Sequence, residues 1–245
     1  MVSVCMISYN GEKYIKEQLD SILKQLEPND EIIISDDGST DSTLSIISAF
    51  NDDRIKVVLH RHEYSSFSGI MGICFNVGRN MMNAMANAKG DCIFFADQDD
   101  IWLPGRVKRI CGILKEYDLV YTDNNIGDEN CSVIAESYFN IKRPSNNIID
   151  TIIRTPFLGC CMAFNKRILQ KALPFPSEPL MHDIWVGIIG QLYGKVFIDY
   201  QPSLIYRRHG DNTSSSGEKS KNPLWFRIYN RVLIIKAIIK KLYSN

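Results

Sequence analysis

The stretch Ile-Phe-Phe-Ala-Asp-Gln-Asp-Asp-Ile-Trp, residues 93–102, is an apolar run that ends directly in three carboxylates. Apolar runs of this length are typical of a strand buried in the centre of a sheet. Asp97, Asp99 and Asp100 then lie at the C-terminal end of that strand, which is where open α/β sheets bind ligands. Because closely spaced like charges repel and a divalent cation relieves the repulsion, the stretch predicts a metal site at the sheet edge.

The sequence on both sides of this stretch alternates between short apolar runs and segments with helical spacing, from the N-terminus to about residue 123. This rhythm is typical of βαβ units and predicts a Rossmann-like α/β fold with a mainly parallel sheet flanked by helices. A turn such as DDGSTD favours a helix capped by Ser39 or Asp41. We expect strands at 2–8, 31–35, 55–59, 92–96 and 119–121, and helices at 12–26, 41–50, 71–88 and 104–115.

In the second half of the chain, strand-like and helix-like segments alternate less regularly. Residues 124–147 are polar and rich in Asn, which favours a variable loop. Residues 209–222 favour a flexible polar loop, and 224–243 an amphipathic helix with Lys and Arg on its polar positions. These features predict one domain over 1–212, followed by a loop and C-terminal helix at 213–245. We expect further strands at 159–164, 196–198 and 203–206, and helices at 148–154, 166–172 and 180–193.

The composition narrows the function classes. The 28 Lys and Arg residues balance 28 Asp and Glu residues, so nothing favours a nucleic-acid partner. The seven cysteines form no CxxC pair, which predicts a reducing compartment without a disulfide framework or a zinc site. The N-terminus is too short and polar for a signal peptide, and no run reaches the roughly 18 apolar residues of a spanning helix. We therefore expect a cytoplasmic protein, or one held peripherally on the inner face of the cytoplasmic membrane.

Three of the expected parallel strands end in polar signatures, at residues 8–10, 36–38 and 97–100. Such an edge suits a nucleoside diphosphate, because an aromatic ring can stack on the base while carboxylates accept from the ribose or hold Mg²⁺ or Mn²⁺. The chain has neither GxxxxGKS nor GxGxxG, so it has no P-loop or classical dinucleotide signature. DDGSTD alone favours a simple turn with a helix cap, but its combination with the acidic stretch 60 residues later favours a site.

Four segments then resemble a known family: SVCMISYNGEKYIKEQLDSIL, EIIISDDGSTDST, GRNMMNAMANAKGDCIFFADQDDIWLPGRV and MHDIWVGIIGQLYGKVFID. Together they resemble family 2 glycosyltransferases. ADQDDIW followed by HDIW and YRRHGDN is most similar to the rhamnosyltransferase-like branch. The resemblance covers about residues 1–212 and implies a GT-A fold, an inverting mechanism, a nucleotide-sugar donor and a divalent metal. It assigns 1–123 to the nucleotide-sugar half and 124–212 to the acceptor half.

The resemblance also implies roles for individual residues. Asp37 is the better candidate for binding the nucleotide base or ribose, with Asp36 beside it. Asp99 is the better candidate for direct metal ligation. Asp100 would shape the site, and Arg207 or Arg208 could neutralise the diphosphate. The implied donor-binding residues are Ser8, Tyr9, Asn10, Asp36, Asp37, Arg79, Asn80, Asp97 and Gln98; the implied metal ligands are Asp99, Asp97 and His209.

The catalytic base of the family matches Asp183, in Met-His-Asp-Ile-Trp. An inverting transfer needs one carboxylate to take the proton of the acceptor hydroxyl, while the metal stabilises the leaving diphosphate. A carboxylate near a helix start is also a favourable charge there, so this alternative stands beside the catalytic one. His182, Trp185 and Trp102 are candidates for the acceptor or sugar pocket, although tryptophans at helical spacing also suit a core. The alternative for His209 is an exposed loop histidine.

These observations predict a hexosyltransferase that adds a sugar to a glycan or lipid-linked glycan acceptor in cell-surface polysaccharide synthesis, such as an O-antigen or capsule. The donor is expected to be dTDP-rhamnose, with a UDP-hexose as the alternative. A sugar nucleotidyltransferase is a second class, but it favours a Gly-rich basic first loop that residues 8–11 lack. A non-catalytic nucleotide-sugar binder is a third. The C-terminal helix could contact a membrane surface, the domain itself or a second copy in a homodimer.

Overall fold

The strands of the central sheet form at the apolar runs of the sequence. The computed structural model describes residues 1–60, 67–210 and 223–243, so part of the polar loop expected at 209–222 lies outside the described residues. Seven strands run in the order β10-β6-β9-β4-β1-β2-β3, and all neighbouring pairs are parallel except the two that involve β9. The expected strands are present as β1 Val2–Ser8, β2 Glu31–Asp36, β3 Ile55–Leu59, β4 Cys92–Ala96, β6 Leu119–Thr122 and β10 Val196–Asp199.

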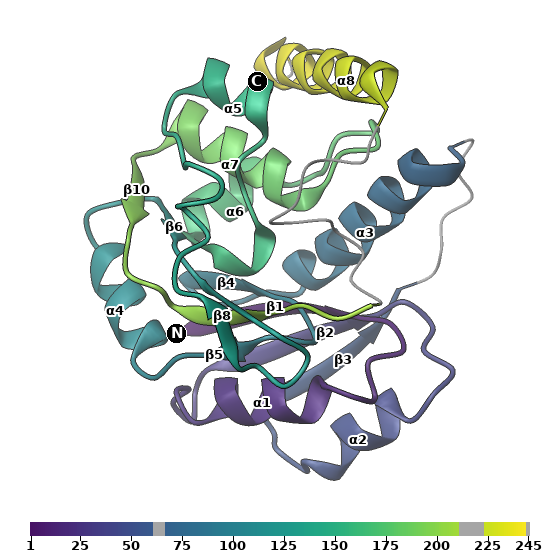
Figure 1. The fold of residues 1–245 in the computed structure, drawn as a ribbon, viewed down its shortest axis with the longest axis vertical. Coiled ribbons are helices and arrows are strands. Elements are labelled where there is room, and N and C mark those ends of the chain that lie inside the picture. The colour runs from purple at the N-terminus through teal and green to yellow at the C-terminus, as the bar shows by residue number, and fades with distance from the viewer. Residues whose placement is uncertain (61–66, 211–222, 244–245) are drawn as a thin grey trace.

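Helices cover both faces of this sheet (Figure 1). The pair α1 and α2 lies below the sheet in this view, and α3, α6 and α7 lie above it. Each helix begins and ends within a few residues of its prediction, which confirms the alternating α/β reading. Asp41 does support the start of α2, since its carboxylate accepts from the backbone N–H of Thr43 at 2.9 Å. The helices are α1 Ile15–Leu23, α2 Thr43–Ala49, α3 Gly69–Ala86, α4 Arg106–Ile113, α5 Ile148–Arg154, α6 Lys166–Ala172 and α7 His182–Tyr193.

One strand runs against the parallel expectation. Residues 159–164 were expected to form a strand; instead Gly159–Cys161 is a 3₁₀ turn, and β9 Met162–Asn165 follows it. This strand is antiparallel to both β4 and β6 and lies between them. Met162, Ala163 and Phe164 are all buried, so the run lacks the alternation that marks a one-sided strand. Burial on both faces predicts a central strand but does not determine its direction.

The expected loop at 124–147 contains two strands of a second sheet, which corrects the sequence reading. Its strand order is β5-β11-β7-β8, with β5 Ile101–Trp102, β7 Asn125–Gly127, β8 Val133–Ala135 and β11 Leu204–Arg207. β7 is parallel to β11, with Ile205 opposite Asn125. β11 confirms the strand expected at 203–206. β5, β7 and β8 are only two or three residues long, and β5 and β7 pair with β11 from far along the chain, so no local pattern predicts them.

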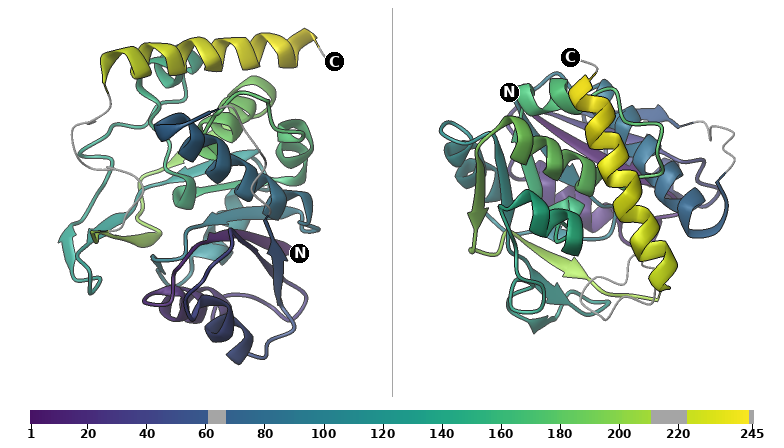
Figure 2. Two further views of the ribbon diagram at one scale, coloured as in Figure 1. Left: turned by 90° about the vertical axis from the view of Figure 1, so that its right-hand side faces the viewer. Right: turned by 90° about the horizontal axis from the view of Figure 1, so that it is seen from above.

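The C-terminal helix is present as α8, Leu224–Tyr243. It lies outermost in the molecule, across α5 and away from the central sheet, in both views of Figure 2. The inward face of the helix carries its buried residues, Phe226, Leu233, Ile234 and Ala237. None of the helices within the described residues combines the length and apolar character needed to cross a bilayer.

Candidate active site

The polar strand ends meet at one edge because β1, β2 and β4 are adjacent and parallel. Ser8 at the end of β1 lies opposite Asp36 at the end of β2, and Met6 lies opposite Ala96 of β4. The turns that follow these strands therefore share the C-terminal edge of the sheet. This placement confirms that the acidic stretch and the two earlier signatures are neighbours in space.

The turn after β1 is braced by Gln98. The Gln98 side-chain Oε1 accepts from the backbone N–H of Tyr9 at 2.9 Å, and its Nε2 donates to the Tyr9 carbonyl at 3.1 Å. A Cβ on Gly11 would lie 2.3 Å from this oxygen, so a larger residue at position 11 would displace the Gln98 side chain from these hydrogen bonds. The Tyr9 ring is exposed and the Asn10 amide oxygen accepts from the Thr40 N–H at 2.8 Å. Gln98 thus holds the turn, while Tyr9 presents its ring at the edge.

The neighbouring carboxylates Asp36 and Asp37 have different surroundings. Asp36 is fully buried, and it accepts from the hydroxyls of Ser8 at 2.8 Å and Ser39 at 2.6 Å and from two backbone N–H groups. These bonds occupy both carboxylate oxygens, so the geometry does not support the expected donor contact for Asp36 or for the Ser8 hydroxyl. Asp37 remains at the edge, with its Oδ1 2.6 Å from Nδ1 of His60. The sequence reading missed His60, which follows the end of β3.

The acidic stretch gathers carboxylates at the end of β4. Side-chain atoms of Asp97, Asp100 and Cys160 lie within 4.8 Å of one another. Burial, reinforced by the charges of Asp99 and Asp183, raises the pKa of Asp97 to about 7. Burial and the neighbouring Asp99 and Asp97 raise the pKa of Asp100 well above its usual range, and Asp100 Oδ2 has no hydrogen-bond partner among the described residues.

This donor set fits a hard divalent cation. Such a cation would offset the repulsion between the carboxylates and favour their ionised forms. Carboxylate oxygens are the ligands that Mg²⁺ and Mn²⁺ prefer, whereas the Cys160 thiol suits softer metals. Burial raises the pKa of that thiol well above its ordinary value, so it acts here as a neutral neighbour.

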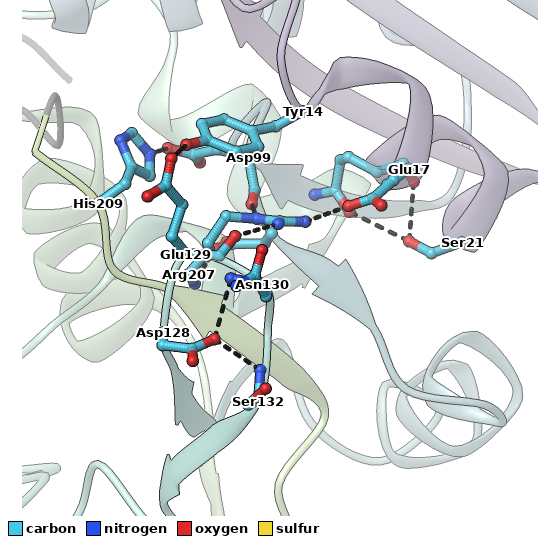
Figure 3. A network of polar contacts seen from close by, with 12 residues as sticks. Tyr14, Glu17, Ser21, Asp99, Asp128, Glu129, Asn130, Ser132, Arg207 and His209 are labelled. Atoms are coloured by element: carbon cyan, nitrogen blue, oxygen red, sulfur yellow. Dashed lines mark hydrogen bonds and ion pairs between the residues drawn. The ribbon is translucent and has the colours of Figure 1, made fainter.

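Asp99 faces the end of β11. Its Oδ2 lies 2.8 Å from Nε2 of His209, and the His209 ring packs on the Tyr14 ring with centroids 4.7 Å apart (Figure 3). The His209 side chain is buried, which excludes its reading as an exposed loop residue. Asp99 and His209 therefore lie together as the resemblance implies.

Arg207 is held in a structural network at the end of β11. Its buried guanidinium donates to the carbonyls of Asp99 at 2.7 Å and Glu129 at 2.6 Å, and to Glu17 Oε2 at 2.5 Å (Figure 3). It also lies 4.6 Å from the centre of the Tyr14 ring. All three guanidinium nitrogens are engaged, so Arg207 joins β11 to α1 and fixes the backbone of the acidic stretch.

Asp183 lies in the first turn of α7 and faces the acidic edge. Its carboxylate accepts from the Ile184 N–H at 2.7 Å and lies close enough to Asp97 for the two charges to interact. Burial raises the pKa of Asp183 to about 6, against the opposing effects of this hydrogen bond and of the Lys142 ammonium. A carboxylate with this pKa is ionised at neutral pH and can accept a proton.

The three expected pocket residues lie in the core, which corrects the sequence reading. Trp185 is buried and its Nε1 donates to the Ala172 carbonyl at 2.9 Å. Trp102 is buried against the Arg106 guanidinium, 4.5 Å from its ring centre. His182 packs edge-on against Phe95 with centroids 5.0 Å apart, and burial lowers its pKa to about 4. These placements do not support contacts with the sugar or acceptor.

The Arg-Asn pair on α3 is only partly brought to the edge. Arg79 is half-buried over the Phe75 ring, 5.0 Å from its centre, and Nη1 lies 3.4 Å from the Met82 sulfur. Asn80 is buried, and its Oδ1 has no hydrogen-bond partner among the described residues. The donor-binding roles of Arg79 and Asn80 stay predictions.

Three further residues support the site without any sequence signal. The Gln18 amide donates to the Asp97 carbonyl at 2.8 Å, and Cys160 lies between Asp97 and Asp100. Lys142 lies near enough to Asp183 to favour its ionised form. Each comes from a segment distant in sequence from its partner, so only the folded chain shows the contact.

Comparison with known proteins agrees with this geometry. The chain is 28% identical over 225 residues to the dTDP-rhamnosyl transferase RfbG of Shigella flexneri, covering 84% of this chain and 72% of that protein. It is also 28% identical over 193 residues to the UDP-Glc:alpha-D-GlcNAc-diphosphoundecaprenol beta-1,3-glucosyltransferase WfgD of Escherichia coli, covering 77% and 70%. The chain therefore spans about 70% of the length of these relatives.

The fold has solved neighbours. Residues 1–349 of TarS from S. aureus, in complex with UDP-GlcNAc, superpose with a TM-score of 0.69 at 22% identity, covering 96% of this chain and 67% of that one. This likeness shows the GT-A fold. The family model described as glycosyl transferase family 2 matches residues 3–173, which include all three polar strand ends. The chain, a glycosyltransferase, therefore belongs to glycosyl transferase family 2.

Proposed function

We propose that this chain transfers a sugar from a nucleoside diphosphate donor to a hydroxyl group of a glycan acceptor, with inversion at C1. One observation carries the proposal: the buried Asp183 carboxylate, with a pKa of about 6, faces the acidic edge that would hold the donor diphosphate. A base on the opposite side of the sugar from the leaving group is what a single displacement with inversion needs.

In this proposal the chain's own residues bind the donor and move one proton. Tyr9 presents its exposed ring to the base, and Asp37 accepts from the base or ribose. Asp183 takes the proton as the acceptor oxygen bonds to C1 and the bond from C1 to the phosphate oxygen breaks. The electron pair of that bond leaves with the nucleoside diphosphate. Asp99, Asp97 and His209 would hold a divalent cation, Mg²⁺ or Mn²⁺, which neutralises the charge developing on the diphosphate.

The donor and acceptor are proposed from the relatives. The similarity to RfbG supports dTDP-rhamnose as the donor. The similarity to WfgD supports UDP-glucose, so a UDP-hexose is the alternative donor. The similarity to WfgD also supports a lipid-linked glycan as the acceptor. We propose that the transfer belongs to cell-surface polysaccharide synthesis, at the cytoplasmic face of the membrane. Residues 1–123 would form the donor half and residues 124–212 the acceptor half. In the latter, an open cleft of about 1030 Å³ is lined by Glu136, Arg143 and Tyr200, among others.

The substitution Asp183→Asn tests the base assignment. The amide keeps the shape of the side chain but cannot accept the proton, so transfer should fall by about 10²–10⁴-fold. Donor binding in the presence of Mn²⁺ should persist, as measured by calorimetry. Asp150→Asn is the matched control, because Asp150 lies in the first turn of α5 and should tolerate the change. Transfer at the wild-type rate in Asp183→Asn would show that another group is the base.

A further inference from the structure

The helix α8 is anchored to the domain by one of its faces. Phe226, Leu233, Ile234 and Ala237 are buried. The Arg231 Nη2 donates to the Ile153 carbonyl at 2.8 Å, and the Lys240 ammonium lies 2.5 Å from the buried carboxylate of Glu178. These contacts fix which side of the helix faces the protein. The opposite side is therefore a defined outer surface.

This outer surface is a continuous apolar stripe. Its residues recur every three or four positions, so they form one line along a helix about 30 Å long. Ile149 and Ile153 on the adjacent α5 are exposed as well. Contiguous apolar surfaces of this kind mark interaction sites on soluble proteins. The α8 outer stripe consists of Trp225, Ile228, Val232, Ile235, Ile239 and Leu242, each 45–60% exposed.

The charges of α8 indicate whether a second copy of the chain or a phospholipid surface covers this stripe. Residues 224–243 contain five basic residues and no Asp or Glu. A second copy paired through this stripe would bring basic side chains against basic side chains, without an acidic partner on the helix. An anionic phospholipid surface supplies the complementary charge, and it accepts an amphipathic helix lying in its plane. Trp225, Tyr229 and Tyr243 have the amphipathic rings that favour the headgroup level.

We propose that the α8 outer stripe, with Ile149 and Ile153, docks this enzyme on an anionic phospholipid bilayer. The helix lies in the interface with its apolar line toward the acyl chains, and the sheet edge stays in water. The docking rests on α8 alone, whereas its use in presenting a lipid-linked acceptor to Asp183 rests on the proposed function.

Vesicle sedimentation of the full chain tests the docking. The protein should bind phosphatidylcholine vesicles that contain phosphatidylglycerol, bind pure phosphatidylcholine much less, and lose affinity as NaCl is raised. The variant Ile228→Ser/Ile235→Ser should partition at least about tenfold less. The matched control is Val57→Ser/Ile134→Ser, which removes two exposed apolar side chains from β3 and β8 and should bind like wild type. Arg227→Glu should weaken binding only to the anionic vesicles.

Several outcomes would overturn the docking. Absence of binding to anionic vesicles is one, and equal loss in the control variant is another. Light scattering that shows a dimer, converted to monomer by Ile228→Ser/Ile235→Ser, would assign the stripe to a second copy. Donor hydrolysis is measured on the same samples. Hydrolysis that persists in a non-binding variant separates the docking from the transfer chemistry, and a failure of hydrolysis in wild type would leave the vesicle result intact.

Discussion

The charge of Asp183 depends on its burial, on the hydrogen bond from the Ile184 N–H and on the Lys142 ammonium. Burial raises the pKa of Asp183 to about 6, and the Lys142 ammonium opposes this rise. A base works only when ionised, so kcat/KM should fall as the pH drops through about 6. In Lys142→Gln the opposing charge is lost, and the acid limb should move to higher pH. The profile is measured at saturating Mn²⁺, with Lys142→Arg as the charge-retaining control; an unmoved limb in Lys142→Gln would contradict the coupling.

Arg207 is the residue on which the shape of the acidic edge depends. Lys in its place keeps the charge but cannot make three separate hydrogen bonds in a planar fork or cover the Tyr14 ring. We expect Arg207→Lys to lower the free energy of unfolding by about 2–4 kcal/mol, measured by urea denaturation. Arg154→Lys, on the exposed surface of α5, should change it by less than about 0.5 kcal/mol. Equal effects of the two substitutions would exclude the structural role.

At the scale of elements, the close approach between the 3₁₀ turn and α7 sets the position of Asp183. A Cβ on Gly159 would lie 2.4 Å from Nε2 of His182, whose buried ring packs edge-on against Phe95. Gly159→Ala should displace the start of α7 and lower kcat by about 10²-fold, since small misplacements of catalytic groups are costly. The double variant Gly159→Ala/His182→Ala should recover activity. Gly112→Ala, where a Cβ meets nothing within 4 Å, is the control.

At the scale of the whole molecule, the candidate ligands Asp99 and His209 come from segments 110 residues apart, so cation and nucleotide should stabilise the fold together. UDP or dTDP should raise Tm by about 5–10 °C at concentrations near 100-fold above Kd, and only with Mn²⁺ present. Thermal-shift measurements with and without EDTA check this. Asp99→Ala should remove the Mn²⁺-dependent part. An equal nucleotide effect in EDTA would argue against metal-assisted donor binding.

The site could be predicted from the sequence only in part, and particular residues show why. Asp97, Asp99 and Asp37 follow apolar runs directly, so their position at the sheet edge follows from local burial and strand direction. Asp36 has the same local pattern as Asp37, but both of its carboxylate oxygens accept hydrogen bonds from Ser8, Ser39 and the backbone of the turn. Trp102 and Trp185 likewise stand beside site residues in the chain while their rings point into the core.

The residue pattern of the chain alone predicts the helices and most strands of the central sheet, the edge shared by β1, β2 and β4, and the acidic character of that edge. These follow from local hydrophobic periodicity, which reports burial and element type. The folded chain alone reveals three further features: the antiparallel direction of β9, the pairing of the second sheet, and the contacts of Arg207, His209 and Lys142 with the edge. Those features depend on pairing between segments far apart in the chain, and such pairing is settled by packing of the whole molecule rather than by any local pattern.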